Sequence, residues 1–174
     1  PTFVDMNLDG RLDILVRHGL PINFVFGGFL ATQAADLIYL QTPDGTFERT
    51  PAPEAEEPGN GIRFAIGDLD ADGRPDAARD GGPGSVYFWH NQTPLEPTGR
   101  AITVRFAPTI SGRPATGTLV RGTCGEITLL RRLTTGGKMG TASASEAHFA
   151  WTSCASGPVT FEVHWPSGAV TQGE

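Results

Sequence analysis

The chain has 174 residues, 39% of them hydrophobic, and its 23 glycines and 14 prolines suit many short strands joined by tight turns rather than helix bundles. Its formal net charge of −6 excludes general nucleic-acid binding through a basic surface. No apolar run approaches the roughly 20 residues of a membrane-spanning helix. Because the chain begins at Pro1 without a signal segment, we expect a processed product or a piece of a longer protein.

An aspartate-rich segment lies near the start of the chain and recurs later. Residues 3–13 (FVDMNLDGRLD) return as residues 65–76 (AIGDLDADGRPD), with the aspartates displaced by 63 positions. The two segments hold seven of the 19 acidic side chains. The acidic excess of the chain therefore sits in two short loops.

Elements of β type are predicted around these two segments. The Asp44-Gly45 pair is a hairpin signal, residues 28–35 are predicted to form one helical turn, and residues 51–60 a proline- and glutamate-rich loop. A glycine turn is expected at 81–84. The β-prone runs predict strands at 14–16, 36–41, 46–49 and 86–89.

A composition break at residues 91–99 (NQTPLEPTG) predicts a linker, which divides the chain into a domain at 1–93 and a second at 97–174. The second half again alternates polar and apolar residues as strands do. Its predicted strands lie at 102–106, 117–120, 126–130 and 159–165, with a turn at 166–168. The predicted fold class is all-β.

The repeated pattern Asp-x-Asn/Asp-x-Asp-Gly-x-x-Asp is the strongest chemical signal in the sequence. Calcium takes about six to eight oxygen ligands, which a tight loop supplies from alternating positions. Carboxylates packed this closely would repel one another without a cation between them. We therefore predict two structural calcium sites. Their expected ligands are Asp5, Asn7, Asp9, the Arg11 carbonyl and Asp13 in the first loop, and Asp68, Asp70, Asp72, the Arg74 carbonyl and Asp76 in the second.

Other interpretations of the loops are open but weaker. An EF-hand needs a bidentate glutamate at its twelfth position, where these segments have Val16 and Arg79. Solvated acidic turns without a metal are less expected because the pattern occurs twice. Magnesium suits an all-protein loop less well than calcium does.

Catalysis is not expected. A catalytic metal site keeps an open position beside a general acid or base, whereas these loops look closed and contain no histidine. Residues 136–139 (GGKM) lack the other residues of a phosphate-binding loop. The histidines are scattered and form no HExxH pair; they are His18, His90, His148 and His164.

Two further features bear on the compartment. Cys124 and Cys154 would close a loop of about 30 residues as a disulfide, worth about 3–4 kcal/mol in the chain-entropy model, and two buried free thiols are the alternative. Asn91-Gln92-Thr93 is a glycosylation sequon, with an unmodified solvated loop as the default interpretation.

The first half of the chain resembles FG-GAP/VCBS repeats, the blades of calcium-binding β-propellers. The resemblance lies in residues 4–15, 39–47 and 66–76. In that family the aspartate-rich loop joins two strands of a blade and holds calcium. The resemblance thus implies partial propeller-like repeats whose loops are the calcium sites.

The second half resembles the ASPIC/UnbV domain from residue 99 to residue 168, including its Trp-Pro-Ser-Gly ending at 165–168. Residues 148–151 (HFAW) and the cysteine pair depart from the usual pattern of that family, which shows His-Phe-Gly-Leu at the first of these places. The resemblance implies a C-terminal β-sandwich or barrel-like domain and an extracellular protein, secreted or at the cell surface.

These features predict a calcium-stabilised structural or adhesion module. Because the resemblance covers fewer than two complete blades, unpaired sheet edges need a cover from neighbouring domains or from other copies of the chain. Strand sharing between copies would build a surface filament. The alternative is a carbohydrate- or protein-binding module of a larger secreted protein that uses Tyr87, Trp89 and Trp151, for which core packing is the competing interpretation.

Overall fold

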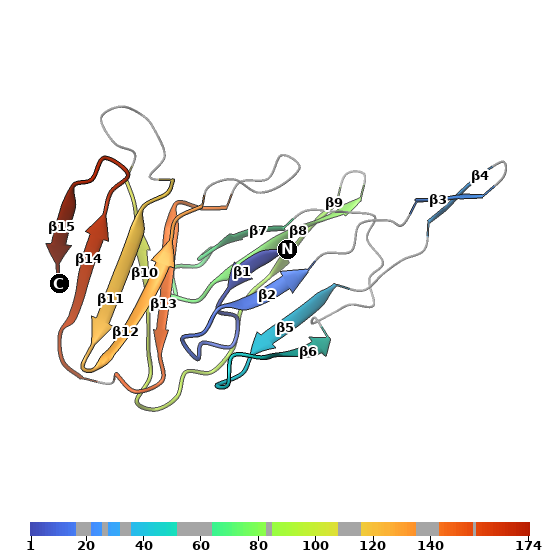
Figure 1. Ribbon diagram of the computed structural model, residues 1–174. Helices are drawn as coiled ribbons and strands as arrows, with labels where there is room; N and C mark the ends of the chain where they lie inside the picture. Colours follow the sequence, from blue (N-terminus) through green and yellow to red (C-terminus); the bar gives the residue numbers. More distant parts are fainter. Residues whose placement is uncertain are drawn as a thin grey trace.

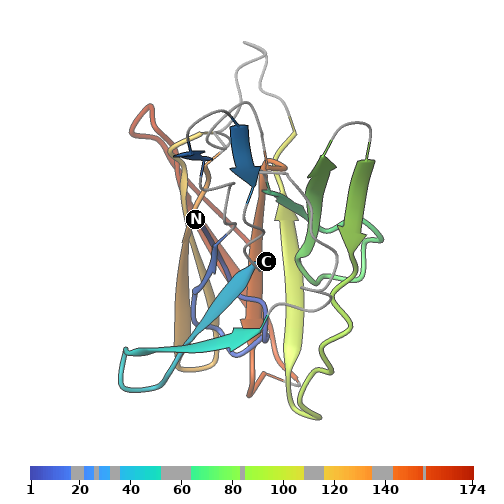
Figure 2. The same cartoon turned by 90° about the vertical axis from the view of Figure 1, so that its right-hand side faces the viewer.

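The computed structural model describes residues 1–16, 22–25, 28–31, 36–51, 64–82, 85–107, 116–134, 143–154 and 156–174. Every regular element in these ranges is a β-strand, which confirms the predicted all-β class. None of the described residues belongs to a helix long and apolar enough to cross a membrane. The C-terminal strands lie at one end of the molecule and the hairpin of β3 (Ile22–Val25) and β4 (Gly28–Ala31) at the other (Figure 1), and Figure 2 views the molecule from the hairpin end.

The first sheet is antiparallel and has the strand order β1-β2-β5-β6. Its strands are β1 (Thr2–Val4), β2 (Asp13–Val16), β5 (Leu37–Gln41) and β6 (Phe47–Pro51). The predicted hairpin at Asp44-Gly45 is confirmed, because Gly45 has a φ of 84° and the Asp44 carboxylate accepts a hydrogen bond from the Thr46 N–H at 3.2 Å. The three strands predicted in this region are confirmed with small shifts of their ends.

The second sheet has the order β7-β8-β9. It contains β7 (Phe64–Gly67), β8 (Asp76–Gly82) and β9 (Ser85–Trp89), which confirms the predicted strand at 86–89. The helical turn predicted at 28–35 is wrong for residues 28–31, because β4 pairs there with β3 and an isolated helical turn gains too few hydrogen bonds to form. Residues 32–35, the predicted loop from 52 onward and the glycine-rich segment at 136–139 lie outside the described residues.

The two N-terminal sheets pack against each other through one apolar cluster. The Phe64 and Trp89 rings meet there with their centroids 5.4 Å apart. Burial of such side chains is the main favourable term in folding. The cluster joins Val4, Leu15 and Ile38 of the first sheet to Phe64, Ile66, Ala77 and Trp89 of the second.

The C-terminal region is a small β-sandwich of a two-stranded sheet, β10-β13, and a four-stranded sheet, β12-β11-β14-β15. Phe149 stacks on Trp151 with centroids 5.6 Å apart, and Phe161 meets Phe149 edge-on at 5.4 Å. Gly122 makes room for these rings, since a Cβ there would lie 3.0 Å from Phe149 and Phe161. The strands are β10 (Arg100–Arg105), β11 (Leu119–Cys124), β12 (Ile127–Arg132), β13 (Glu146–Trp151), β14 (Val159–His164) and β15 (Val170–Gly173).

A disulfide joins Cys124 at the end of β11 to Cys154, with the Cα atoms 6.0 Å apart. Both cysteines are buried in the cluster between the C-terminal sheets. The predicted disulfide is therefore confirmed over the alternative of two free thiols.

The two halves of the chain meet along β7. The Ala144 N–H donates to the Ile66 carbonyl at 3.0 Å, and the Asp68 N–H donates to the Glu146 carboxylate at 3.0 Å. Residues 143–146 thus cover one edge of the second sheet. The division of the chain between residues 93 and 97 stays a prediction, and the two parts share an interface that contains both aspartate-rich loops.

Candidate metal centre

The first aspartate-rich loop connects β1 to β2 and is folded around its own carboxylates. Asp5 accepts hydrogen bonds from the N–H groups of Asp9 and Gly10 at 3.1 and 2.9 Å. Asp13 accepts one from the Met6 N–H at 2.9 Å. The first and last aspartates of the pattern therefore hold the loop closed.

The second loop connects β7 to β8 and repeats these bonds. Asp68 accepts from the N–H groups of Asp72 and Gly73 at 3.1 and 3.2 Å. Asp76 accepts from the Leu69 N–H at 2.8 Å. The 63-residue sequence repeat is thus also a repeat of local structure.

Both loops require the same unusual backbone. Leu8 and Ala71 have φ values of 62° and 63°, and Gly10 and Gly73 have φ values of 89° and 87°. Positive φ suits glycine but costs about 1 kcal/mol or more at other residues. The glycine in each pattern is therefore needed for the turn, and the loops accept strain at the residue two positions before it.

The last aspartate of each loop also accepts a hydrogen bond from the backbone of a later segment of the same sheet. For the first loop this segment is β5, and for the second it is the chain just after β9. The Gln41 N–H donates to Asp13 at 2.9 Å, and the Asn91 N–H donates to Asp76 at 2.8 Å. Both aspartates are buried, at 0% and 1% exposure. Each loop is thereby fixed to its own sheet on two sides.

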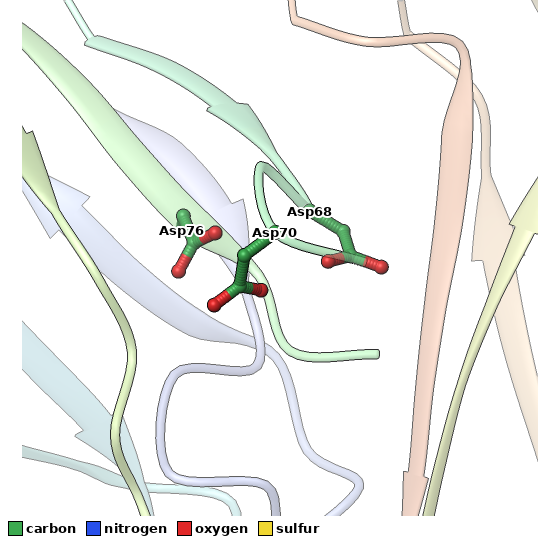
Figure 3. A group of neighbouring side chains, drawn as sticks. All are labelled: Asp68, Asp70 and Asp76. Atoms are coloured by element: carbon green, nitrogen blue, oxygen red, sulfur yellow. The ribbon is translucent and has the colours of Figure 1, made fainter. Parts of the chain in front are cut away.

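In the second loop, three carboxylates converge. One carboxylate oxygen of each of Asp68, Asp70 and Asp76 lies within 4.8 Å of the other two, and Figure 3 shows the three side chains. Calcium–oxygen distances of about 2.3–2.6 Å place neighbouring ligands at such separations, and hard carboxylate oxygens are the donors that calcium prefers. The donor set therefore fits calcium. In the first loop, Asn7 stands at the position of Asp70, so the corresponding set has one carboxylate fewer.

Asp9 and Asp72, both predicted ligands, form ion pairs with arginine side chains. Each carboxylate pairs with a guanidinium group two residues later, Asp9 with Arg11 and Asp72 with Arg74. Each also accepts the N–H of that arginine, at 2.9 and 2.8 Å. The ligand roles predicted for these aspartates and for the Arg11 and Arg74 carbonyls stay predictions.

Arg131, on β12 of the sandwich, reaches into the first loop. Its Nη2 donates to the Gly10 carbonyl at 3.0 Å and lies 3.5 Å from the Asp5 carboxylate, while its Nε donates to the His148 carbonyl at 2.8 Å. Sequence reasoning did not identify this contact. The available signal was the Arg131-Arg132 pair, because neighbouring residues of a strand face opposite sides and one arginine must therefore point inward.

Arg105, at the end of β10, makes the corresponding contact with the second loop. Its Nη2 donates to the Asp68 carbonyl at 2.9 Å and lies 3.5 Å from the Asp68 carboxylate. Its Nε also pairs with Glu146 at 2.9 Å. Each loop therefore receives one arginine from the sandwich at its first aspartate.

Burial disfavours the ionised form of carboxylates in the first loop. It raises the pKa of Asp5 from 3.8 to about 7, against the opposing effect of Arg131, and it also raises the pKa of Asp13. Ionised carboxylates in such a place need a nearby cation to offset their lost hydration.

His90 and Asn91 follow β9 and lie beside the second loop. The His90 Nδ1 is 3.9 Å from the Asp70 carboxylate and 4.0 Å from that of Asp76. The Asn91 Nδ2, the atom to which a glycan would be attached, donates a hydrogen bond to the Met6 carbonyl at 3.0 Å. Asn91 as a whole is 9% exposed. A glycan at Asn91 would have to break this bond, and glycosylation there stays a prediction.

Of the three aromatic residues considered for ligand binding, the two tryptophans are packed inside the protein and Tyr87 is half-buried. Trp89 is 8% exposed and Trp151 is 1% exposed, and the Arg79 guanidinium lies 4.7 Å from the Tyr87 ring centroid. The competing interpretation, core packing, is therefore the one that the structure shows for the two tryptophans. They offer no open platform for a sugar ring.

Comparison with protein families places part of the chain in a known repeat. Residues 25–79 match the FG-GAP-like repeat family, a range that includes the second loop and ends before the sandwich. No curated protein matched the chain. The matched segment is thus similar to a module of extracellular adhesion and propeller proteins that serves structure or binding rather than catalysis. The ASPIC/UnbV resemblance of the second half stays a prediction.

Proposed function

We propose that the chain is a calcium-stabilised structural or adhesion module of an extracellular protein and that it has no catalytic activity. The observation that carries this proposal is the convergence of Asp68, Asp70 and Asp76 within 4.8 Å in a tight loop between two strands. The FG-GAP-like match at residues 25–79 supports it, because this segment contains all three aspartates.

A cation in this loop would tie together parts that are distant in the chain. Asp68 directly follows β7, Asp76 begins β8, and Arg105 of the sandwich contacts Asp68. With the cation bound, the carboxylates would no longer repel one another, and the sheet and the sandwich would share a rigid junction. The expected role of calcium is therefore mechanical.

Calcium titration of the metal-stripped chain by isothermal calorimetry tests the proposal. We expect saturable uptake at millimolar calcium or below, and no comparable uptake of magnesium at the same concentration. Absence of calcium uptake at several millimolar would refute the proposed function. A turnover screen with and without calcium would address catalysis separately.

We also propose that the open edges and apolar faces of the N-terminal sheets bind neighbouring domains or further copies of the chain. Phe3, Val86 and Phe88 of these sheets are 62%, 60% and 59% exposed, so apolar surface is available for such contacts. Strand sharing between copies would yield a filament. Light scattering during size-exclusion chromatography tests this: a strictly monomeric chain at all concentrations would rule out assembly from this chain alone.

A further inference from the structure

The two loops share one backbone conformation but differ in charge. Around the first loop, three carboxylates face two guanidinium groups, so the formal charge is about −1; the groups are Asp5, Asp9, Asp13, Arg11 and Arg131. Around the second, five carboxylates face two guanidinium groups, so the formal charge is about −3; these are Asp68, Asp70, Asp72, Asp76, Glu146, Arg74 and Arg105.

The arginines supplied by the sandwich are also unequal. The Arg131 side chain is 9% exposed, and its hydrogen-bond partners besides Asp5 are neutral carbonyls. The Arg105 side chain is 52% exposed and shares its charge with Glu146. Water therefore screens the charge of Arg105 much more than it screens the charge of the buried Arg131.

We propose that the second loop is the preferred calcium site and that Arg131 is a built-in counter-ion that joins the first loop to the sandwich without a metal. The inference rests on the proposed calcium-dependent function. Calcium affinity in such loops follows the number of charged ligands, and the second loop has Asp70 where the first has Asn7.

The first loop is closed against the sandwich by contacts that need no cation. Arg131 donates to the Gly10 carbonyl at 3.0 Å and to the His148 carbonyl at 2.8 Å, so one side chain bridges the loop and β13. The Gly10 backbone itself lies against the sandwich, since a Cβ there would be 3.0 Å from the Ala150 carbonyl oxygen. Arg131 is therefore a positioning residue for the first loop.

A reciprocal exchange tests which loop binds calcium more tightly. Isothermal calorimetry of the wild-type chain should show one calcium event about tenfold or more tighter than any second event. Asp70→Asn should weaken the tight event by about tenfold and leave the weak event unchanged. Asn7→Asp should strengthen the weak event by about tenfold and leave the tight one unchanged.

Arg131→Gln tests the counter-ion. It removes the positive charge beside the first loop, so the weak calcium event should tighten by about threefold or more while the tight event stays the same. The matched control is Arg121→Gln on the neighbouring strand β11. It removes a guanidinium group that pairs with Glu162 instead of with a loop aspartate. This control should change neither event.

The outcomes separate this inference from the proposed function. Two events of equal affinity in the wild type, or a tight event that survives Asp70→Asn, would overturn the assignment to the second loop. No calcium uptake at all would overturn the proposed function itself. If Arg131→Gln does not fold, the Asn7 and Asp70 variants decide the assignment by themselves.

Discussion

The guanidinium group of Arg131 lies 3.5 Å from the carboxylate of Asp5, although 126 residues separate the two in the chain. Arg105 and Asp68 stand in the same relationship at the second loop, also at 3.5 Å. In both cases the first aspartate of the loop meets an arginine of the sandwich. The loops are therefore candidate metal centres and, at the same time, the surface on which the C-terminal strands pack.

At about pH 8, where Asp5 is mostly ionised, replacing Arg131 with alanine should lower the free energy of unfolding in EDTA by about 3 kcal/mol, because the loss of one member of a buried ion pair leaves the other uncompensated. Adding Asp5→Asn should restore part of the loss, since no buried charge then remains unpaired. Urea unfolding measures both effects. Arg121→Ala, which breaks a pair with Glu162 at 3.0 Å with the Arg121 side chain 51% exposed, is the control and should cost less than about 1 kcal/mol. Equal losses for the two arginines would contradict the buried contact.

Gly10→Ala should destabilise the protein more than Gly45→Ala does. Both glycines have similar φ values, 89° and 84°, so the backbone strain of an added Cβ is alike, at about 1 kcal/mol. A Cβ at Gly45 meets nothing within 4 Å, whereas one at Gly10 would lie 3.0 Å from the Ala150 carbonyl oxygen. The extra cost of Gly10→Ala in urea unfolding, about 1–2 kcal/mol, therefore measures the packing of the loop on the sandwich. A zero difference would mean that the loop does not touch the sandwich in solution.

The sequence predicted features that depend on local patterns. Runs of β-prone or alternating residues located eight of the fifteen strands of the described residues, the Asp44-Gly45 pair located a hairpin, and the spacing of the aspartates located two loops that fold alike. The cysteine pair predicted the disulfide because the chain has no other cysteine. In each case, the residues that make the structure are close in sequence or unique in type.

The sequence did not predict the contacts that make the loops unequal. The partner of Asp5 is Arg131, and nothing local in either segment encodes a contact across 126 residues. The strand at 28–31 was missed because its apolar residues suit a helical turn or a strand, and pairing with β3 decides between them. Tertiary packing determines both the Asp5–Arg131 contact and the strand at 28–31. A single sequence contains little direct information about such packing.

Reduction of the Cys124–Cys154 disulfide should lower the free energy of unfolding by about 2–4 kcal/mol, because the bridge limits the freedom of the unfolded chain across 30 residues. Urea unfolding with and without a phosphine reductant measures the change, and thiol titration confirms that reduction is complete. The double variant Cys124→Ala/Cys154→Ala should behave like the reduced protein. Unchanged unfolding after complete reduction would show that the bridge adds no stability.

Calcium at about 100 times its dissociation constant should stabilise the folded chain by about 2.7 kcal/mol per site, which corresponds to a rise in Tm of about 5–10 °C for a chain of this size. Scanning calorimetry in EDTA and in calcium measures the shift. Asp76→Asn should remove most of it, because Asp76 is one of the three converging carboxylates. Asp44→Asn, in an exposed hairpin turn and outside both sets of expected ligands, is the control and should keep it. Identical melting curves in EDTA and calcium would count against any structural metal.

Asp5 should make the metal-free protein less stable as the pH rises. Burial raises the pKa of Asp5 from 3.8 to about 7, so the folded state keeps a proton that the unfolded state releases. The stability that this proton provides is complete below the unfolded pKa and is lost as the pH rises through the folded one. In EDTA, the loss attributable to Asp5 should therefore develop between about pH 4 and pH 7 and reach about 4 kcal/mol.

The wild-type pH profile alone would not reveal this loss, because His148 acts in the opposite direction. Burial lowers the pKa of His148 from 6.5, so its contribution to stability is present above that value and is lost as the pH falls. Asp5→Asn removes one effect and keeps the other. The unfolding free energy of Asp5→Asn relative to wild type, measured with urea in EDTA, should therefore rise from pH 4 to pH 7.5, and calcium bound at the first loop should reduce that rise. A difference that stays flat with pH would show that the pKa of Asp5 is the same in the folded and unfolded states and would contradict this prediction.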